Sequence, residues 1–196
     1  AAFDPESNML YVRTSEGASP NQVCAIDPNV PDVDVPYTNN CPRGGSAGIF
    51  RGLDGYVPTE RSQLGPIPLL KPPYAKLVAI DLNAGDIAWS VPFGEGSRIV
   101  RNHPLLRDAD LPARLGTPGA NGPMVTAGGL VMLGGGDPYL YAFDAATGRE
   151  VHRVATEFRT SGNPMTYRSG AGRQFILIAT GAGPDASLVA FALPEG

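Results

Sequence analysis

An internal repeat constrains the fold of this chain more than any other feature of its sequence. Residues 77–91 read LVAIDLNAGDIAWSV and residues 140–154 read LYAFDAATGREVHRV, so that Asp81 matches Asp144 at an offset of 63 positions. In each copy an Asp and a Gly bracket a turn, because an Asp carboxylate bonds nearby backbone N–H groups and Gly accepts a positive φ. Each copy therefore predicts a β-hairpin.

A second, shorter offset indicates how the hairpins are grouped. GPMVTAGG at residues 122–129 matches NPMTYRSG at residues 163–170, which lie 41 positions further on. A repeat of about 40 residues is the length of one four-stranded propeller blade. We therefore predict an all-β chain that forms a partial β-propeller of about three four-stranded antiparallel blades, at residues 1–92, 117–157 and 161–193.

The last of these blades contains only three strand-like runs, and three blades cannot close a ring. Propellers remove their sheet edges by closure. The chain is therefore expected to be the C-terminal piece of a larger propeller, whose N-terminal segment supplies the missing outer strand. A start without Met or a leader also indicates a processed chain or an excised fragment. Open blade edges predict self-association by strand pairing or swapping.

The composition agrees with a loop-rich β chain and excludes several classes of partner. The 25 glycines and 20 prolines argue against helical bundles, because both residues break helices. A hydrophobic share of 42% with a net charge of −4 argues against wholesale disorder. The absence of a Lys/Arg cluster argues against nucleic acid as a partner. No apolar run reaches the ~18 residues of a membrane span.

Short runs of apolar or alternating residues, bounded by Gly, Pro, Asn or Asp, predict the strands. They lie near Met9–Arg13, Lys76–Asp81, Ile87–Val91, Met124–Ala127, Leu130–Leu133, Tyr139–Asp144, Glu150–Ala155, Pro164–Tyr167, Gln174–Ala179 and Leu188–Ala192. The opening AAFDPESNMLYV adds a strand and a turn, and residues 94–116 are expected to hold one helical turn.

Prolines mark residues 16–74 as one long insertion inside the first blade. The insertion contains the only two cysteines, Cys24 and Cys41. Two cysteines fix no spacing pattern, so they either close a loop as a disulfide or remain free thiols.

Several segments resemble one family when they are taken in order. The hairpin AIDLNAGDIAW, at 79–89, resembles the Ala-x-Asp-x-x-x-Gly-x-x-x-Trp repeat of quinoprotein dehydrogenases, the pyrroloquinoline quinone (PQQ) family. LPARLGTPGANGPMVTAGGLVMLGG, followed by DPYLYAFDAATGREV, resembles the penultimate blade of its membrane-bound, glucose-dehydrogenase-like members. SGNPMTYRSGAGRQFILIATG and SLVAFALPEG are similar to their C-terminal end.

This resemblance implies an eight-bladed propeller that holds PQQ and a calcium ion on its axis. It implies oxidation of a sugar or alcohol in the periplasm, with or without an inner-membrane anchor, and transfer of electrons to a quinone or cytochrome. The catalytic Asp, the calcium carboxylate and the PQQ-contacting Lys of the family belong to earlier blades, upstream of Ala1. The fragment alone is therefore expected to be inactive, and no catalytic or metal residue is assigned in it.

Three residues are candidates for cofactor binding on the same resemblance. Thr14 stands where relatives have a polar PQQ contact, and its hydroxyl can donate to a quinone oxygen; otherwise it is a strand-end turn residue. Asn121 and Gly122 open the inner strand of a blade, facing the axis. Glycine there lets the backbone approach a flat cofactor closely, and Asn121 adds an amide or simply serves a turn.

The other polar and aromatic residues are interpreted structurally. Trp89 is expected to dock flat between blades with its indole N–H satisfied. His152 occupies the matching position of the second repeat and is expected to be a partly buried substitute for Trp. Asp81 and Asp144 begin turns and are rejected as a catalytic pair.

A second function class stays open at this point. Non-catalytic PQQ-repeat scaffolds share the hairpin without binding PQQ, and such a propeller would bind protein partners. GPMVTAGG favours the enzymes, since it resembles them specifically.

Overall fold

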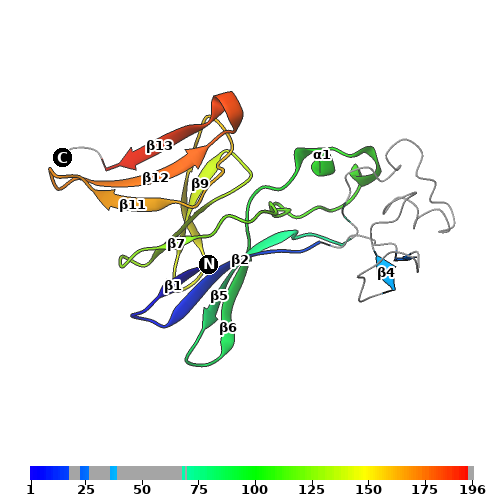
Figure 1. Ribbon diagram of the computed structural model, residues 1–196, viewed down its shortest axis with the longest axis horizontal. Coiled ribbons are helices and arrows are strands. Elements are labelled where there is room, and N and C mark those ends of the chain that lie inside the picture. Colours follow the sequence, from blue (N-terminus) through cyan, green and yellow to red (C-terminus); the bar gives the residue numbers. More distant parts are fainter. Residues whose placement is uncertain (18–22, 27–35, 39–67, 69, 194–196) are drawn as a thin grey trace.

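The computed structural model describes residues 1–17, 23–26, 36–38, 68 and 70–193, and this part of the chain is nearly all β (Figure 1). Three antiparallel sheets fan out from a common centre (Figure 1). The first sheet has the order β1-β2-β5-β6, the second β10-β9-β8-β7 and the third β11-β12-β13. The prediction of an all-β chain built from four-stranded antiparallel units is confirmed.

The strands of these sheets are joined mostly by short turns. Those of the first sheet are β1 (Ala2–Asp4), β2 (Met9–Ser15), β5 (Ala75–Asp81) and β6 (Asp86–Pro92). Those of the second are β7 (Met124–Val125), β8 (Leu130–Gly134), β9 (Tyr139–Asp144) and β10 (Glu150–Ala155). Those of the third are β11 (Met165–Arg168), β12 (Gln174–Thr180) and β13 (Ser187–Ala192).

The remaining elements are short. A separate two-stranded ladder joins β3 (Cys24–Ala25) to β4 (Tyr37–Thr38) inside the insertion. The helical elements are α1 (Arg98–Arg101) and the 3₁₀ turns η2 (Pro104–Leu106) and η3 (Gly183–Asp185). The single helical turn expected within 94–116 is therefore present as α1, followed by η2.

The two central strands of the second sheet are buried on both faces, which explains the nearly continuous apolar runs of β8 and β9. Because side chains alternate along a strand, odd-numbered and even-numbered residues of these strands face opposite neighbours. The odd-numbered face packs on Tyr11, Leu77 and Ala79 of the first sheet. The even-numbered face packs on Ile178 of the third sheet. Each sheet interface therefore has its own hydrophobic core.

The first and second sheets are also joined by Trp89, which carries out the predicted docking role. Its indole Nε1 donates to the carbonyl oxygen of Ala145 at 3.0 Å. A Cβ placed on Gly148 would lie only 2.5 Å from the Trp89 ring, so the ring lies directly over that glycine. The two repeated hairpins therefore touch each other through the Trp of one and the turn of the next.

The turns of the repeat also form as predicted. The Asp81 carboxylate accepts from the backbone N–H groups of Asn83 and Ala84, and Asp144 accepts from the backbone and hydroxyl of Thr147. These hydrogen bonds lower the pKa of Asp144. Both carboxylates are therefore occupied as turn acceptors.

Three observations change or extend the expectations. His152 is exposed rather than partly buried, because it lies on β10, the edge strand of its sheet, where residues 151–153 are all exposed. The insertion contains the β3–β4 ladder, which its prolines do not reveal. Cys24 is disulfide-bonded, and Cys41 lies outside the described residues.

The Trp89 contact generates a test with a matched control. Gly85 and Gly148 occupy equivalent turns with the same φ of +70°, but a Cβ on Gly85 meets nothing within 4 Å. Gly85→Ala should cost about 1 kcal/mol through its backbone conformation alone. Gly148→Ala should cost about 1–3 kcal/mol more, because its methyl collides with the indole. Urea unfolding of the full-length variants measures the difference, and equal losses would contradict the docking contact.

Candidate functional site

A cavity of about 520 Å³ opens at one end of the three sheets. Its walls come from the end of β2 and from the connections that precede β7, join β8 to β9, precede β11 and join β12 to β13. The lining residues are Arg13, Pro118, Gly119, Asn121, Gly135, Gly136, Phe158, Arg159, Thr160, Ser161, Gly181, Ala182 and Asp185. These segments all lie at the same end of the sheets, so the packing of the sheets against one another forms the cavity.

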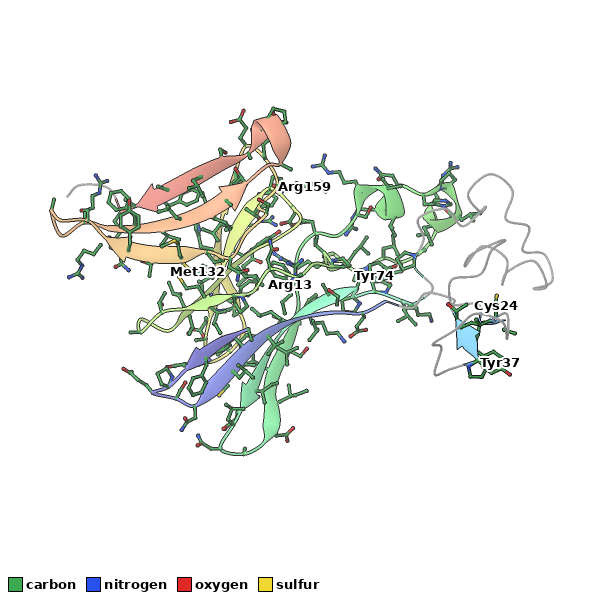
Figure 2. All side chains as sticks on the ribbon, viewed as in Figure 1. Arg13, Cys24, Tyr37, Tyr74, Met132 and Arg159 are labelled. Atoms are coloured by element: carbon green, nitrogen blue, oxygen red, sulfur yellow. The ribbon has the colours of Figure 1, made fainter. Side chains whose placement is uncertain are left out.

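Arg13 forms one wall of this cavity at the point where the sheets converge (Figure 2). Its Nη2 donates to the carbonyls of Thr117 at 2.6 Å and Gly135 at 2.9 Å, and its guanidinium lies 4.8 Å from the centre of the Phe93 ring. Nε and Nη1 are buried without a hydrogen-bond partner among the described residues. Burial lowers the pKa of Arg13, an effect that Asp137 opposes.

Glycines let the backbone come close to Arg13. Gly135 has φ +143°, and a Cβ there would lie 2.1 Å from Arg13 Nη1. A Cβ on Gly119 would lie 2.6 Å from Arg13 Nη2. Only glycine leaves room for the guanidinium at these two positions, so they keep a positive charge within the cavity wall.

Asp137 ties the cavity to the rest of the second sheet. It is 7% exposed, and its Oδ2 accepts from Tyr141 Oη at 2.7 Å and from Glu95 N at 3.1 Å. Burial raises the pKa of Tyr141, and the bond to Asp137 raises it further. The Asp137 carboxylate therefore anchors the 94–116 connection against β9.

Thr160 fixes the opposite wall. It is 2% exposed, and its hydroxyl accepts from Gly135 N at 2.6 Å and lies 3.1 Å from the Asp137 carbonyl, to which it can donate. Its backbone N–H also donates to that carbonyl at 3.0 Å. The connections on either side of the cavity are therefore bonded to each other.

The predicted cofactor residues are distributed unevenly around this cavity. Asn121 lines it, and its amide Nδ2 would lie 3.2 Å from a Cβ on Gly135. Gly122 is buried behind it, and its N–H donates to Asn163 Oδ1 at 2.6 Å. Thr14 does not line the cavity, and its hydroxyl lies 3.5 Å from the Lys76 carbonyl.

Sequence reasoning missed the two arginines of the cavity. Met9, Tyr11 and Arg13 alternate along β2 on the face that packs against the second sheet, so the pattern could have identified Arg13 as an inward-facing cation. Arg159 had no such signal, because its place depends on how the connections fold.

Within the described ranges, no group of three or more His, Cys, Asp or Glu could hold a metal ion. No helix of the same residues is long and apolar enough to cross a membrane. The calcium ligands expected upstream remain a prediction.

Comparisons with known proteins agree with this architecture. Residues 1–176 match the family described as "PQQ: Glucose/ethanol/alcohol dehydrogenase, beta-propeller domain". A probable quinate dehydrogenase (quinone) of Xanthomonas campestris pv. juglandis is 39% identical over 68% of this chain and 17% of its own length. The quinate/shikimate dehydrogenase (quinone) of Acinetobacter baylyi is 31% identical over 99% of this chain and 25% of its own length.

A third relative, the glycerol dehydrogenase large subunit of Gluconobacter thailandicus, is 29% identical over 99% of this chain and 28% of its own length. The chain thus spans about a quarter or less of the relatives with quinate dehydrogenase names. The family match covers most of the chain. The chain therefore belongs to the PQQ-dependent glucose/ethanol/alcohol dehydrogenase family and forms part of its β-propeller domain.

Proposed function

We propose that the full-length protein oxidises a sugar, alcohol or polyol with PQQ and passes the electrons to a quinone or cytochrome in the periplasm. The observation that carries this proposal is the cavity beside Arg13 at one end of the sheets, in a chain of the PQQ family. The relatives named for quinate and for glycerol support a hydroxyl-bearing substrate.

The cavity suits PQQ, which is a flat quinone that carries carboxylate groups. Arg13 supplies a buried positive charge with unpartnered N–H groups beside the cavity, and Asn121 supplies an amide. Gly135 and Gly136, with φ of +143° and +99°, keep the backbone open where side chains would otherwise intrude. When bound, PQQ supplies the two-electron acceptor that the protein itself lacks.

The residues of this chain act by positioning. Asn121 can donate to an oxygen of the cofactor, and Gly122 keeps the start of β7 close because its N–H is bonded to Asn163. In this proposal the proton acceptor and the calcium ligands lie in the rest of the full-length protein, so the isolated chain is inactive.

The proposed function is tested by reconstitution of the full-length protein with PQQ and Ca²⁺. Dye reduction should follow the addition of at least one member of a panel of aldoses, polyols and hydroxy acids. The isolated chain should reduce no dye under the same conditions. PQQ-independent reduction, or none across the whole panel, would favour the non-catalytic scaffold.

The proposed cofactor residue Asn121 is tested by PQQ binding. Asn121→Ala should raise the Kd for PQQ about tenfold, since it removes one donor worth about 1.4 kcal/mol. Asn102→Ala is the control, because Asn102 ends α1 and does not line the cavity. Fluorescence titration measures the Kd. An unchanged value for Asn121→Ala would remove Asn121 from the cofactor site.

The third sheet carries an apolar face that the remaining blades are proposed to cover. Met165, Tyr167 and Leu188 are 54%, 42% and 72% exposed, and β13 is an edge strand. An uncovered edge of this kind pairs readily with another chain. The isolated chain should therefore self-associate, with an average mass in light scattering that rises with concentration. A monodisperse monomer would contradict this prediction.

A further inference from the structure

Two opposite charges beside the cavity are buried without contacting each other. Nε and Nη1 of Arg13 and Oδ1 of Asp137 are all buried with no hydrogen-bond partner among the described residues. No ion pair joins the two side chains in that part of the protein. Buried polar atoms without a partner are uncommon, and each one calls for an explanation.

Aromatic rings connect the two charges. The Arg13 guanidinium lies 4.8 Å from the centre of the Phe93 ring, which meets the Tyr141 ring edge-on at 5.3 Å between centres. The Tyr141 hydroxyl in turn donates to Asp137 Oδ2 at 2.7 Å. Apolar surroundings screen a charge far less than water does, so Asp137 acts on Arg13 without touching it. The pKa of Arg13 agrees with this, because burial lowers it and the Asp137 carboxylate raises it.

The two charges differ in their access to the cavity. Arg13 lines it, whereas Asp137 does not and is bonded instead to Tyr141 and to the backbone N–H of Glu95. An anion in the cavity therefore meets the cation first and the carboxylate at a greater distance. Since Coulomb energy falls with distance, Arg13 attracts the anion more than Asp137 repels it, and Asp137 reduces the net attraction.

The other charged groups of the cavity have a weaker influence. Arg159 and Asp185 line it but are exposed, so that water screens their charges. The Arg13 guanidinium does not lose its proton in a protein. Its charge is therefore permanent, and the buried carboxylate of Asp137 is the group placed to temper it.

We propose that Asp137 is the buried counter-ion of Arg13 and that the pair sets how tightly the cavity holds an anionic cofactor. Asp137 stabilises the guanidinium inside the protein and at the same time weakens its attraction for the carboxylates of PQQ. Asp137 is thus a positioning residue that limits anion affinity without touching the ligand. The statement about PQQ rests on the proposed function, whereas the counter-ion role does not.

The counter-ion role is tested by a double-mutant cycle, with urea unfolding of the full-length protein as the measurement. Arg13→Gln and Asp137→Asn each leave one buried charge without its opposite, so each should lower the urea midpoint. The double variant contains neither charge and should lose less stability than the two single losses add up to. Asp137→Asn combined with Arg107→Gln is the control and should be additive, because Arg107 is exposed and does not line the cavity.

The effect on anion affinity is tested with PQQ and its trimethyl ester, in which every carboxylate is masked. Both probes are titrated into the cofactor-free full-length protein. Asp137→Asn should lower the Kd for PQQ about tenfold, since it removes the opposing charge, and should leave the Kd for the ester unchanged. Asp108→Asn, at an exposed carboxylate outside the cavity, should change neither value.

The outcomes separate this inference from the proposed function. Weaker binding of both probes by Asp137→Asn would mean that the carboxylate only braces the cavity wall, and this result or an unchanged Kd for PQQ would overturn the inference. Strictly additive losses in the cycle would overturn the counter-ion role. If Asp137→Asn alone does not fold, folding of the double variant supports that role and its failure contradicts it. If the wild type binds no PQQ, the proposed function fails, and the cycle still decides whether Asp137 is the counter-ion of Arg13.

Discussion

The burial of one sheet between two others is the constraint on which the rest of this structure depends. The central strands β8 and β9 of the second sheet have no solvent face, because their alternate residues enter two different cores. A strand of this kind must be apolar at every position, as LVMLG and YLYAF are. Since both neighbours pack against it, the ends of all three sheets are brought together, and the cavity forms where their connections meet.

Local chemistry accounts for the parts of the fold that the sequence predicted well. The hairpin turns could be placed because Asp81 and Asp144 each bond the backbone of their own turn. The β3–β4 ladder could not, because it is only two residue pairs long and lies among prolines. The offset between repeats placed His152 correctly in β10, but its exposure depends on what packs against this edge strand, which a repeat alignment does not describe.

The residues of the candidate site also differ in how well the sequence could predict them. Asn121 could be predicted, since it opens an inner strand whose position follows from the repeat, and it does line the cavity. Thr14 lies one residue from Arg13, and strand alternation turns it to the other face of β2. Arg159 and Asn121 line the same cavity only because two separate connections fold together, and no local sequence pattern predicts this. Backbone order was therefore easier to predict than the side chains that share a cavity.

The seat of Trp89 on Gly148 has an evolutionary consequence. The indole of Trp89 fits against the next repeat because Gly148 has no side chain there, so neither residue can be substituted without affecting the other. A bulkier residue at the glycine would be tolerated only after the tryptophan had been lost. Because His152 stands where the tryptophan would be, the repeat that follows does not need a glycine to accommodate an indole. Successive repeats of this chain are thus expected to diverge one after another, because the glycine of one repeat can change only after the tryptophan of the repeat before it has been lost.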